Sequence, residues 1–180
     1  MALRNAPDQF GLVSRTLHWG MVVLVITMLA LGLRISSMEP GLANLWLYGL
    51  HKTLGILTLT LILIRLGRHL YTPPPRPIGP AGPAALVARA VHWAFYLLLV
   101  AIPLTGWAGS SATGIDVMIA DRWTLPPLVA PSVEGEALWF RLHGILTKVL
   151  IGLVGLHMLG ALKRQMAGDG TLTRMLRGKA

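Results

Sequence analysis

Four histidines interrupt the long apolar stretches of this chain of 180 residues: His18, His51, His143 and His157. An ionisable ring in an apolar segment is costly unless something binds it, so such residues favour a functional interpretation. Imidazole is also the commonest metal ligand in proteins. The four rings therefore predict a site that binds a metal or another ligand. Its geometry depends on the elements that hold the rings.

The composition indicates a membrane protein. Apolar residues make up 54% of the chain, and the mean hydropathy of +0.63 is too high for an ordinary soluble domain. The chain has no cysteine, which excludes disulfides, iron–sulfur clusters, thiolate zinc sites and cofactors attached through C-x-x-C-H. The net charge is +9, but the basic residues cluster between the apolar stretches and are not interleaved with exposed aromatic residues on a soluble face. We therefore expect no nucleic-acid binding.

The apolar stretches predict an all-α membrane protein, a bundle of four transmembrane helices forming a single domain over residues 1–180. A spanning helix needs about 20 mostly apolar residues. Four stretches meet this requirement: 17–35, 45–64, 87–108 and 138–162. An even number of spans places both termini on one side of the membrane.

The flanking charges predict that this side is the cytoplasm. Lys and Arg near spans are retained there, and they cluster on the side of the termini, accompanied only by Asp8 and Asp169. The charges on the opposite side cancel. We expect residues 72–83, which are rich in proline, to form a semi-rigid cytoplasmic strap. The long connection at 109–137 is expected to fold back as a lid on the outer side.

The predicted topology places the histidines at two depths. His18 lies near the inner end of the first span, whereas His51 and His143 lie near the outer ends of theirs. His157 follows His143 by fourteen residues, which is roughly 21 Å deeper along a helix and within about 40° of the same face. Depth therefore pairs His18 with His157 and His51 with His143.

Two bis-histidine haem b sites are the simplest prediction from these pairs. A six-coordinate haem iron needs an imidazole on each face of the macrocycle, and helices of a bundle can supply both. Zinc or copper is the rival use of histidine, but no Asp or Glu lies within a span and the two levels are too far apart for one four-ligand site. A single such histidine could also be a hydrogen-bonded structural residue.

Five glycines near the histidines have two interpretations. Small residues let a flat cofactor approach the backbone, and they also let helices pack closely in lipid. The five are Gly20, Gly55, Gly144, Gly152 and Gly155.

Basic residues close to the histidines are candidates to bind the haem propionates: Arg15 at the inner level, and Lys52 and Arg141 at the outer level. Their alternative role is anchoring at the membrane interface. The two outer cations could also attract a small anionic substrate. His92, near the inner end of the third span, could be a structural hydrogen-bonding residue, a quinone contact or a proton relay.

Several segments together resemble the bacterial di-haem cytochrome b561 family. They are R-T-L-H-W at His18, L-H-K-T-L-G at His51, R-L-H-G-I-L at His143 and G-L-H-M-L-G-A-L-K at His157. The third span, V-H-W-A-F-Y-L-L-L-V-A-I-P-L-T-G-W, and the tail, G-D-G-T-L-T-R-M-L, are also similar. The resemblance covers nearly the full chain.

The resemblance implies a multi-pass protein of the bacterial inner membrane that binds two haem b groups through the same histidine pairs. It implies electron transfer between the periplasmic side and the quinone pool, most concretely a superoxide:ubiquinone oxidoreductase with ubiquinone as acceptor. Superoxide or a periplasmic redox donor would supply the electrons. The candidate quinone contacts are Arg68, Arg76 and His92. Arg164 and Gln165 stand where the family often has further histidines.

Two other functions stay open at this point. The chain could be a cytochrome b subunit that anchors a larger dehydrogenase or hydrogenase, since it has no soluble catalytic domain of its own. In a different class, it could be a non-redox membrane protein such as a metal carrier or a scaffold.

Overall fold

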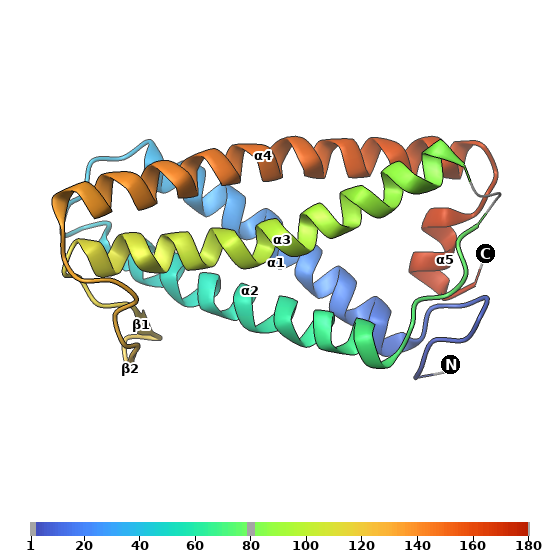
Figure 1. Ribbon diagram of the computed structural model, residues 1–180, viewed down its shortest axis with the longest axis horizontal. Helices are drawn as coiled ribbons and strands as arrows, with labels where there is room; N and C mark the ends of the chain where they lie inside the picture. The colour runs from blue at the N-terminus through green and yellow to red at the C-terminus, as the bar shows by residue number, and fades with distance from the viewer. Residues whose placement is uncertain (1–2, 79–81, 180) are drawn as a thin grey trace.

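The computed structural model describes residues 3–78 and 82–179, and four long helices dominate it (Figure 1). They are α1 (Leu12–Ser36), α2 (Leu45–Tyr71), α3 (Pro83–Ala112) and α4 (Val133–Met166). Each is long and apolar enough to cross a membrane. The predicted fold class, an all-α bundle of four membrane helices, is confirmed, and each predicted span lies within one of these helices.

The long helices run along the longest axis of the molecule, with both termini at one end (Figure 1). Helix α3 packs closely on α4 and on α2, and α1 packs on α2. We call the end with the termini the inner end and the opposite end the outer end, following the orientation predicted from charge. This arrangement places the inner ends of all four spans beside the chain termini.

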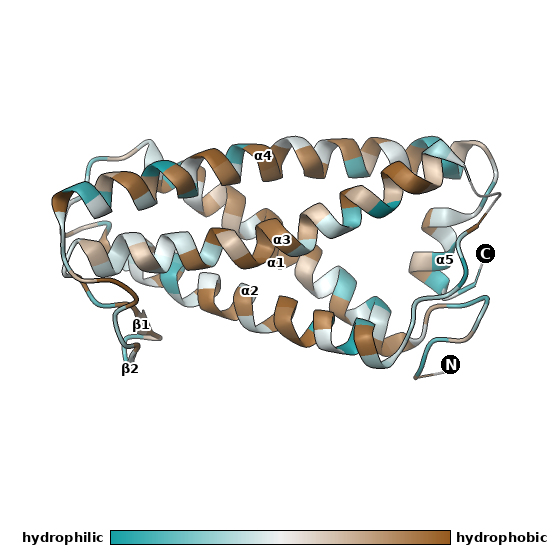
Figure 2. Ribbon diagram, in the orientation of Figure 1, coloured by the Kyte–Doolittle hydropathy of each residue, from teal (hydrophilic) through white to brown (hydrophobic). Residues whose placement is uncertain are grey.

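The helix surface is apolar, as expected of a protein that faces lipid. Hydrophilic residues concentrate in the loops and at helix ends (Figure 2). Large apolar side chains such as Val23, Leu97 and Leu159 are exposed along the helices. The buried core is small and lies mid-bundle, where it consists of Met21, Val25, Ile62, Leu98, Leu99 and Leu150.

The outer connection folds back on the bundle as predicted, but it contains a hairpin that the sequence did not indicate. Strands β1 (Met118–Ile119) and β2 (Trp123–Thr124) pair antiparallel. Ala120 and Asp121 turn the hairpin with φ of 50° and 54°, a region that residues other than glycine rarely adopt. The Thr53 hydroxyl oxygen accepts a bond from the backbone N–H of Ala120 at 3.0 Å, which ties the hairpin to α2.

The inner end is closed by a short helix, α5 (Thr171–Arg177), which the sequence did not indicate either. The Trp19 indole N–H donates to the carbonyl of Met175 at 3.2 Å, and Phe10 donates its N–H to Gly178 at 2.8 Å. Arg174, only 6% exposed, reaches the carbonyl of Arg76 on the strap at 2.8 Å. Helix α5 thus ties the N-terminal segment and the strap to the inner end of α1.

Candidate functional site

The four histidines of the apolar helices lie in two pairs, one near each end of the bundle. The ring centroids of His18 on α1 and His157 on α4 are 6.5 Å apart, with their planes inclined by 62°. Those of His51 on α2 and His143 on α4 are 6.2 Å apart, inclined by 76°. These are the pairs predicted from depth. Their role as axial ligands stays a prediction at this point.

The spacing of each pair suits two imidazoles on opposite sides of one metal ion. A metal–imidazole bond is about 2 Å long, and the ring centre lies about 1 Å further, so the two centroids would be about 6 Å apart. Within the described residues no group of three or more His, Cys, Asp or Glu could hold a metal by itself. The donor sets therefore fit a metal whose other ligands come with a cofactor, as in a porphyrin.

The helices that carry the paired histidines are held apart. Helix α4 packs closely on α3 and α5, and neither α1 nor α2 makes comparable contact with α4. Leu150 is the one residue of α4 that the bundle fully buries in the described chain. A flat group placed between the rings of each pair would therefore lie between helices that the protein itself does not bring together.

Hydrogen bonds orient the outer pair. His143 Nδ1 donates to the carbonyl of Ile102 at 2.9 Å and lies 3.4 Å from the Thr105 hydroxyl. Ile102 directly precedes Pro103, which lies inside α3. The hydrogen bond to Ile102 leaves Nε2 free to coordinate, and such a backbone partner is typical of metal-bound histidine. His51 Nδ1 is buried without a hydrogen-bond partner in the described part of the chain.

Two glycines make room for the outer rings. A Cβ on Gly106 would lie 3.1 Å from both Cε1 and Nδ1 of His143, and one on Gly32 would lie 3.3 Å from Cε1 of His51. Neither glycine was predicted from the sequence to contact a histidine, because both are distant from the paired histidines along the chain. Of the five glycines noted from sequence, only Gly55 has a neighbour within 4 Å of an added Cβ, which is the Met28 methyl.

An arginine that the sequence did not single out lies at the inner pair. Both terminal nitrogens of Arg65 on α2 lie 3.2 Å from His18 Nδ1. His157, the other member of this pair, has two further aromatic neighbours. Its ring centroid lies 5.5 Å from that of His92 and 5.3 Å from that of Phe95. His92 Nδ1 donates to the carbonyl of Ala88 at 2.6 Å, so it has the local bond expected of a structural histidine.

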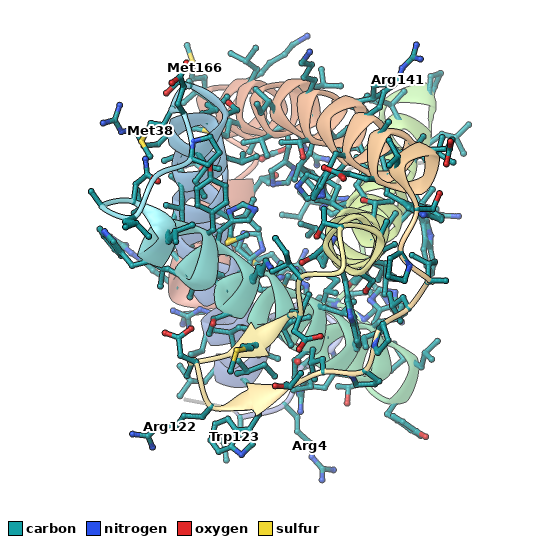
Figure 3. All side chains as sticks on the ribbon, turned by 90° about the vertical axis from the view of Figure 1, so that its left-hand side faces the viewer. Arg4, Met38, Arg122, Trp123, Arg141 and Met166 are labelled. Atoms are coloured by element: carbon teal, nitrogen blue, oxygen red, sulfur yellow. The ribbon has the colours of Figure 1, made fainter. Side chains whose placement is uncertain are left out.

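The cations expected to bind propionates have other partners or point away. Arg15 donates to the carbonyls of Met175 and Leu176, which supports a structural role at α5. Lys52 Nζ donates to the carbonyl of Asp116 at 3.0 Å, beside the hairpin. Arg141 points away from the bundle (Figure 3). Propionate binding by these three residues stays a prediction without direct support.

The candidate quinone contacts do not form one cluster. Arg76 lies on the strap, where it lines an open hollow of about 290 Å³ together with Arg174. His92 is exposed on α3. Arg68 differs from both, because its Nε and one terminal nitrogen are buried in the protein and have no hydrogen-bond partner among the described residues.

Arg164 and Gln165, at positions where the family often has histidines, form hydrogen bonds that hold α5 and the strap. Arg164 donates to Asp169 at 2.6 Å and to the Ile78 carbonyl at 2.7 Å, and the Gln165 side-chain oxygen accepts from the N–H of Leu172 at 3.0 Å. Burial alone would raise the pKa of the Asp169 carboxyl, but hydrogen bonds from Thr171 and Arg164 lower it below its usual value. This carboxylate therefore stays charged beside Arg164.

These observations define a class of protein: a four-helix membrane protein with two intramembrane histidine pairs that suit metal-centred cofactors. Residues 9–178 match the family described as prokaryotic cytochrome b561. The chain belongs to this family, whose members are membrane electron-transfer proteins that bind haem b.

Two relatives cover nearly the whole chain. Cytochrome b561 homolog 2 of Escherichia coli (strain K12) is 33% identical over 181 residues, which is 98% of this chain and 95% of the relative. A protein of Yersinia pestis named probable superoxide oxidase CybB is 29% identical over 170 residues, covering 89% of this chain and 91% of the relative.

The contact of Gly106 with His143 yields a testable prediction. In Gly106→Val the added atoms would push the His143 ring away from the Ile102 carbonyl, with an overpacking cost of about 1–3 kcal/mol. We expect lower haem b content and a lower midpoint of thermal unfolding. Gly67→Val is the matched control, because a Cβ on Gly67 of α2 meets nothing within 4 Å. Equal effects of the two substitutions would contradict the proposed crowding.

Proposed function

We propose that this protein binds two haem b groups, with His18 and His157 as axial ligands at the inner level and His51 and His143 at the outer level. The observation that carries the proposal is the pair of near-equal imidazole separations, 6.5 and 6.2 Å, at opposite ends of the bundle. When bound, haem b supplies one-electron redox chemistry. The protein would then transfer electrons across the bacterial inner membrane, between its periplasmic side and the quinone pool.

The chain's own residues hold and separate the two centres. His143 and His157 are each seven residues from Leu150 on α4, so both rings lie on nearly the same face of one helix. Leu150, with Val25, Ile62, Leu98 and other core residues, fills the mid-bundle between the two levels. This apolar layer excludes water and ions from the interior.

The most concrete form of the proposal is a superoxide:ubiquinone oxidoreductase. Two superoxide anions release one electron each at the outer side and leave as dioxygen, and one ubiquinone takes up both electrons and two protons to become ubiquinol. The printed name of the Yersinia pestis relative supports this choice. Lys52 and Arg141 provide positive charge at the outer end, and His92 and Arg76 are the candidates whose side chains a quinone could reach from outside the bundle.

The ligand assignment predicts that each haem can be removed without the other. His157→Ala should remove only the inner haem and His143→Ala only the outer one, since each substitution leaves the other pair intact. A reduced-minus-oxidised optical spectrum measures both, with the alpha band falling by about half in each variant. His69→Ala is the control, because His69 packs against Trp93 and Tyr96 and not against a paired histidine. Wild-type spectra from both ligand variants would refute the assignment.

The activity predicts that purified protein with added ubiquinone consumes superoxide faster than spontaneous dismutation and forms ubiquinol. Superoxide dismutase added in excess should abolish ubiquinol formation, because it removes the electron donor. His143→Ala should be inactive, since it lacks the outer centre. A rate equal to spontaneous dismutation would refute the superoxide activity and leave haem binding unaffected.

A further inference from the structure

Arg65 and Arg68, near the inner end of α2, carry charges for which these helices provide no carboxylate. Helices α1, α2 and α3 contain no Asp or Glu, and the two in α4, Glu134 and Glu136, lie in its first turn at the outer end. A cation within a membrane helix is costly unless an acceptor stabilises it. The two arginines therefore indicate a counter-charge that comes from outside the polypeptide.

The side chains of both arginines are short of acceptors. Arg68 Nε and one of its terminal nitrogens are buried and form no hydrogen bond to any described residue. Arg65 has one side-chain partner in the same part of the structure, which is His18 Nδ1. Buried polar groups in native proteins nearly always have a partner, so each exception calls for an explanation.

Coordination by His18 would remove the one partner of Arg65. A neutral imidazole that binds iron through Nε2 carries its proton on Nδ1, which then donates and cannot accept a hydrogen bond. The Arg65 guanidinium, which only donates, would then need another acceptor at the same level of the bundle. An anion next to His18 would satisfy this need.

The other arginines near the inner end whose side chains are not exposed already have acceptors. Arg15 donates to the carbonyls of Met175 and Leu176, and Arg174 to that of Arg76. Arg164 donates to Asp169 and to the Ile78 carbonyl. Arg174 keeps one buried nitrogen, Nε, without a partner, but its other contact is to a carbonyl. In the described chain, Arg65 and Arg68 are therefore the half-buried arginines at this end whose side chains lack any carboxylate or carbonyl partner.

The two arginines are also placed to act together. Residues three apart are neighbours on a helix surface, and Arg68 lies about 4.5 Å nearer the inner end than Arg65 along α2. Each propionate of haem is a carboxylate, and guanidinium groups bind carboxylates through paired, charge-assisted hydrogen bonds. A single molecule with two carboxylates at this level of the bundle could therefore pair with both arginines.

We propose that Arg65 and Arg68 form the propionate-binding site of the inner haem, and that Arg65 exchanges its contact with His18 for a carboxylate when the haem binds. This assignment rests on the proposed function, since it presupposes a haem held by His18 and His157. It replaces Arg15 as the inner propionate partner, and it gives Arg68 a role other than quinone binding.

A redox titration of the purified holoprotein with the double substitution Arg65→Gln and Arg68→Gln tests the proposal. Loss of two positive charges beside the propionates favours the oxidised haem, so the midpoint potential of the inner haem should fall. We expect at least a tenfold change in the one-electron equilibrium, which corresponds to about 59 mV. The outer haem should not shift. Arg89→Gln is the matched control, because Arg89 is an exposed arginine on α3 near the inner end.

A second measurement changes the propionates of the haem. The full chain is loaded either with haem b or with haem b whose two propionates are methyl esters, and loss of haem from the inner site to apomyoglobin is followed. In the wild-type protein the ester should be lost roughly tenfold faster, because it cannot accept the charge-assisted bonds of the arginines. In the double variant, haem b and its methyl ester should be lost from the inner site at equal rates.

The outcomes separate this assignment from the proposed function. Wild-type protein that takes up no haem would refute the function itself. A double variant that keeps both haems with an unshifted inner potential would refute only the assignment, as would an ester lost no faster than haem b from wild-type protein. A variant with an unshifted potential and weakened ubiquinone binding would assign Arg68 to the quinone instead.

Discussion

The structure depends on one constraint, which is that an imidazole within the hydrocarbon layer needs a bound partner. Water is not available there to solvate a polar ring, so an unpartnered histidine at this depth destabilises the fold. Four such rings in this chain face one another in two pairs. Haem b, the cofactor of the family, is a partner that would suit the spacing of each pair.

In the proposed assignment, α4 is the helix that would allow two haem centres in so small a bundle. It contributes one histidine to each pair, with Leu150 midway between them. In the proposed assignment the other two ligands come from α1 and α2, whose directions across the membrane are opposite. Helix α3 contributes support in place of a ligand, since its Ile102 carbonyl and Gly106 position the His143 ring. Hydrogen bonds of this kind fix the ring orientation of a ligating histidine.

The sequence predicted the features that depend on hydrophobic length and helical spacing. The four spans followed from apolar stretches, and the histidine pairs followed from counting residues along them. Apart from the histidine pairs, contacts between side chains of distant segments were not predicted. Gly32 and Gly106 act across helix interfaces, and Arg65 stands at the end of a predicted span, where its charge indicated only orientation.

The short elements were also beyond prediction, for a physical reason. Helix α5 has seven residues, too few to be stable alone, and it is held by Arg15, Gln165 and neighbouring segments. Strands β1 and β2 have two residues each, which is too short for an alternating pattern, and their turn uses Ala120 and Asp121 in place of glycine. Tertiary contacts, and not local propensity, determine both.

The central claim is that paired imidazoles at two depths each hold one haem iron. The most direct test is the ratio of haem b to protein in the purified chain, measured together with the electron paramagnetic resonance spectrum of the oxidised form. The account predicts two haems per chain, both low-spin because each iron has two axial imidazoles. One haem per chain, or a dominant high-spin signal from an iron with a single axial histidine, would contradict it.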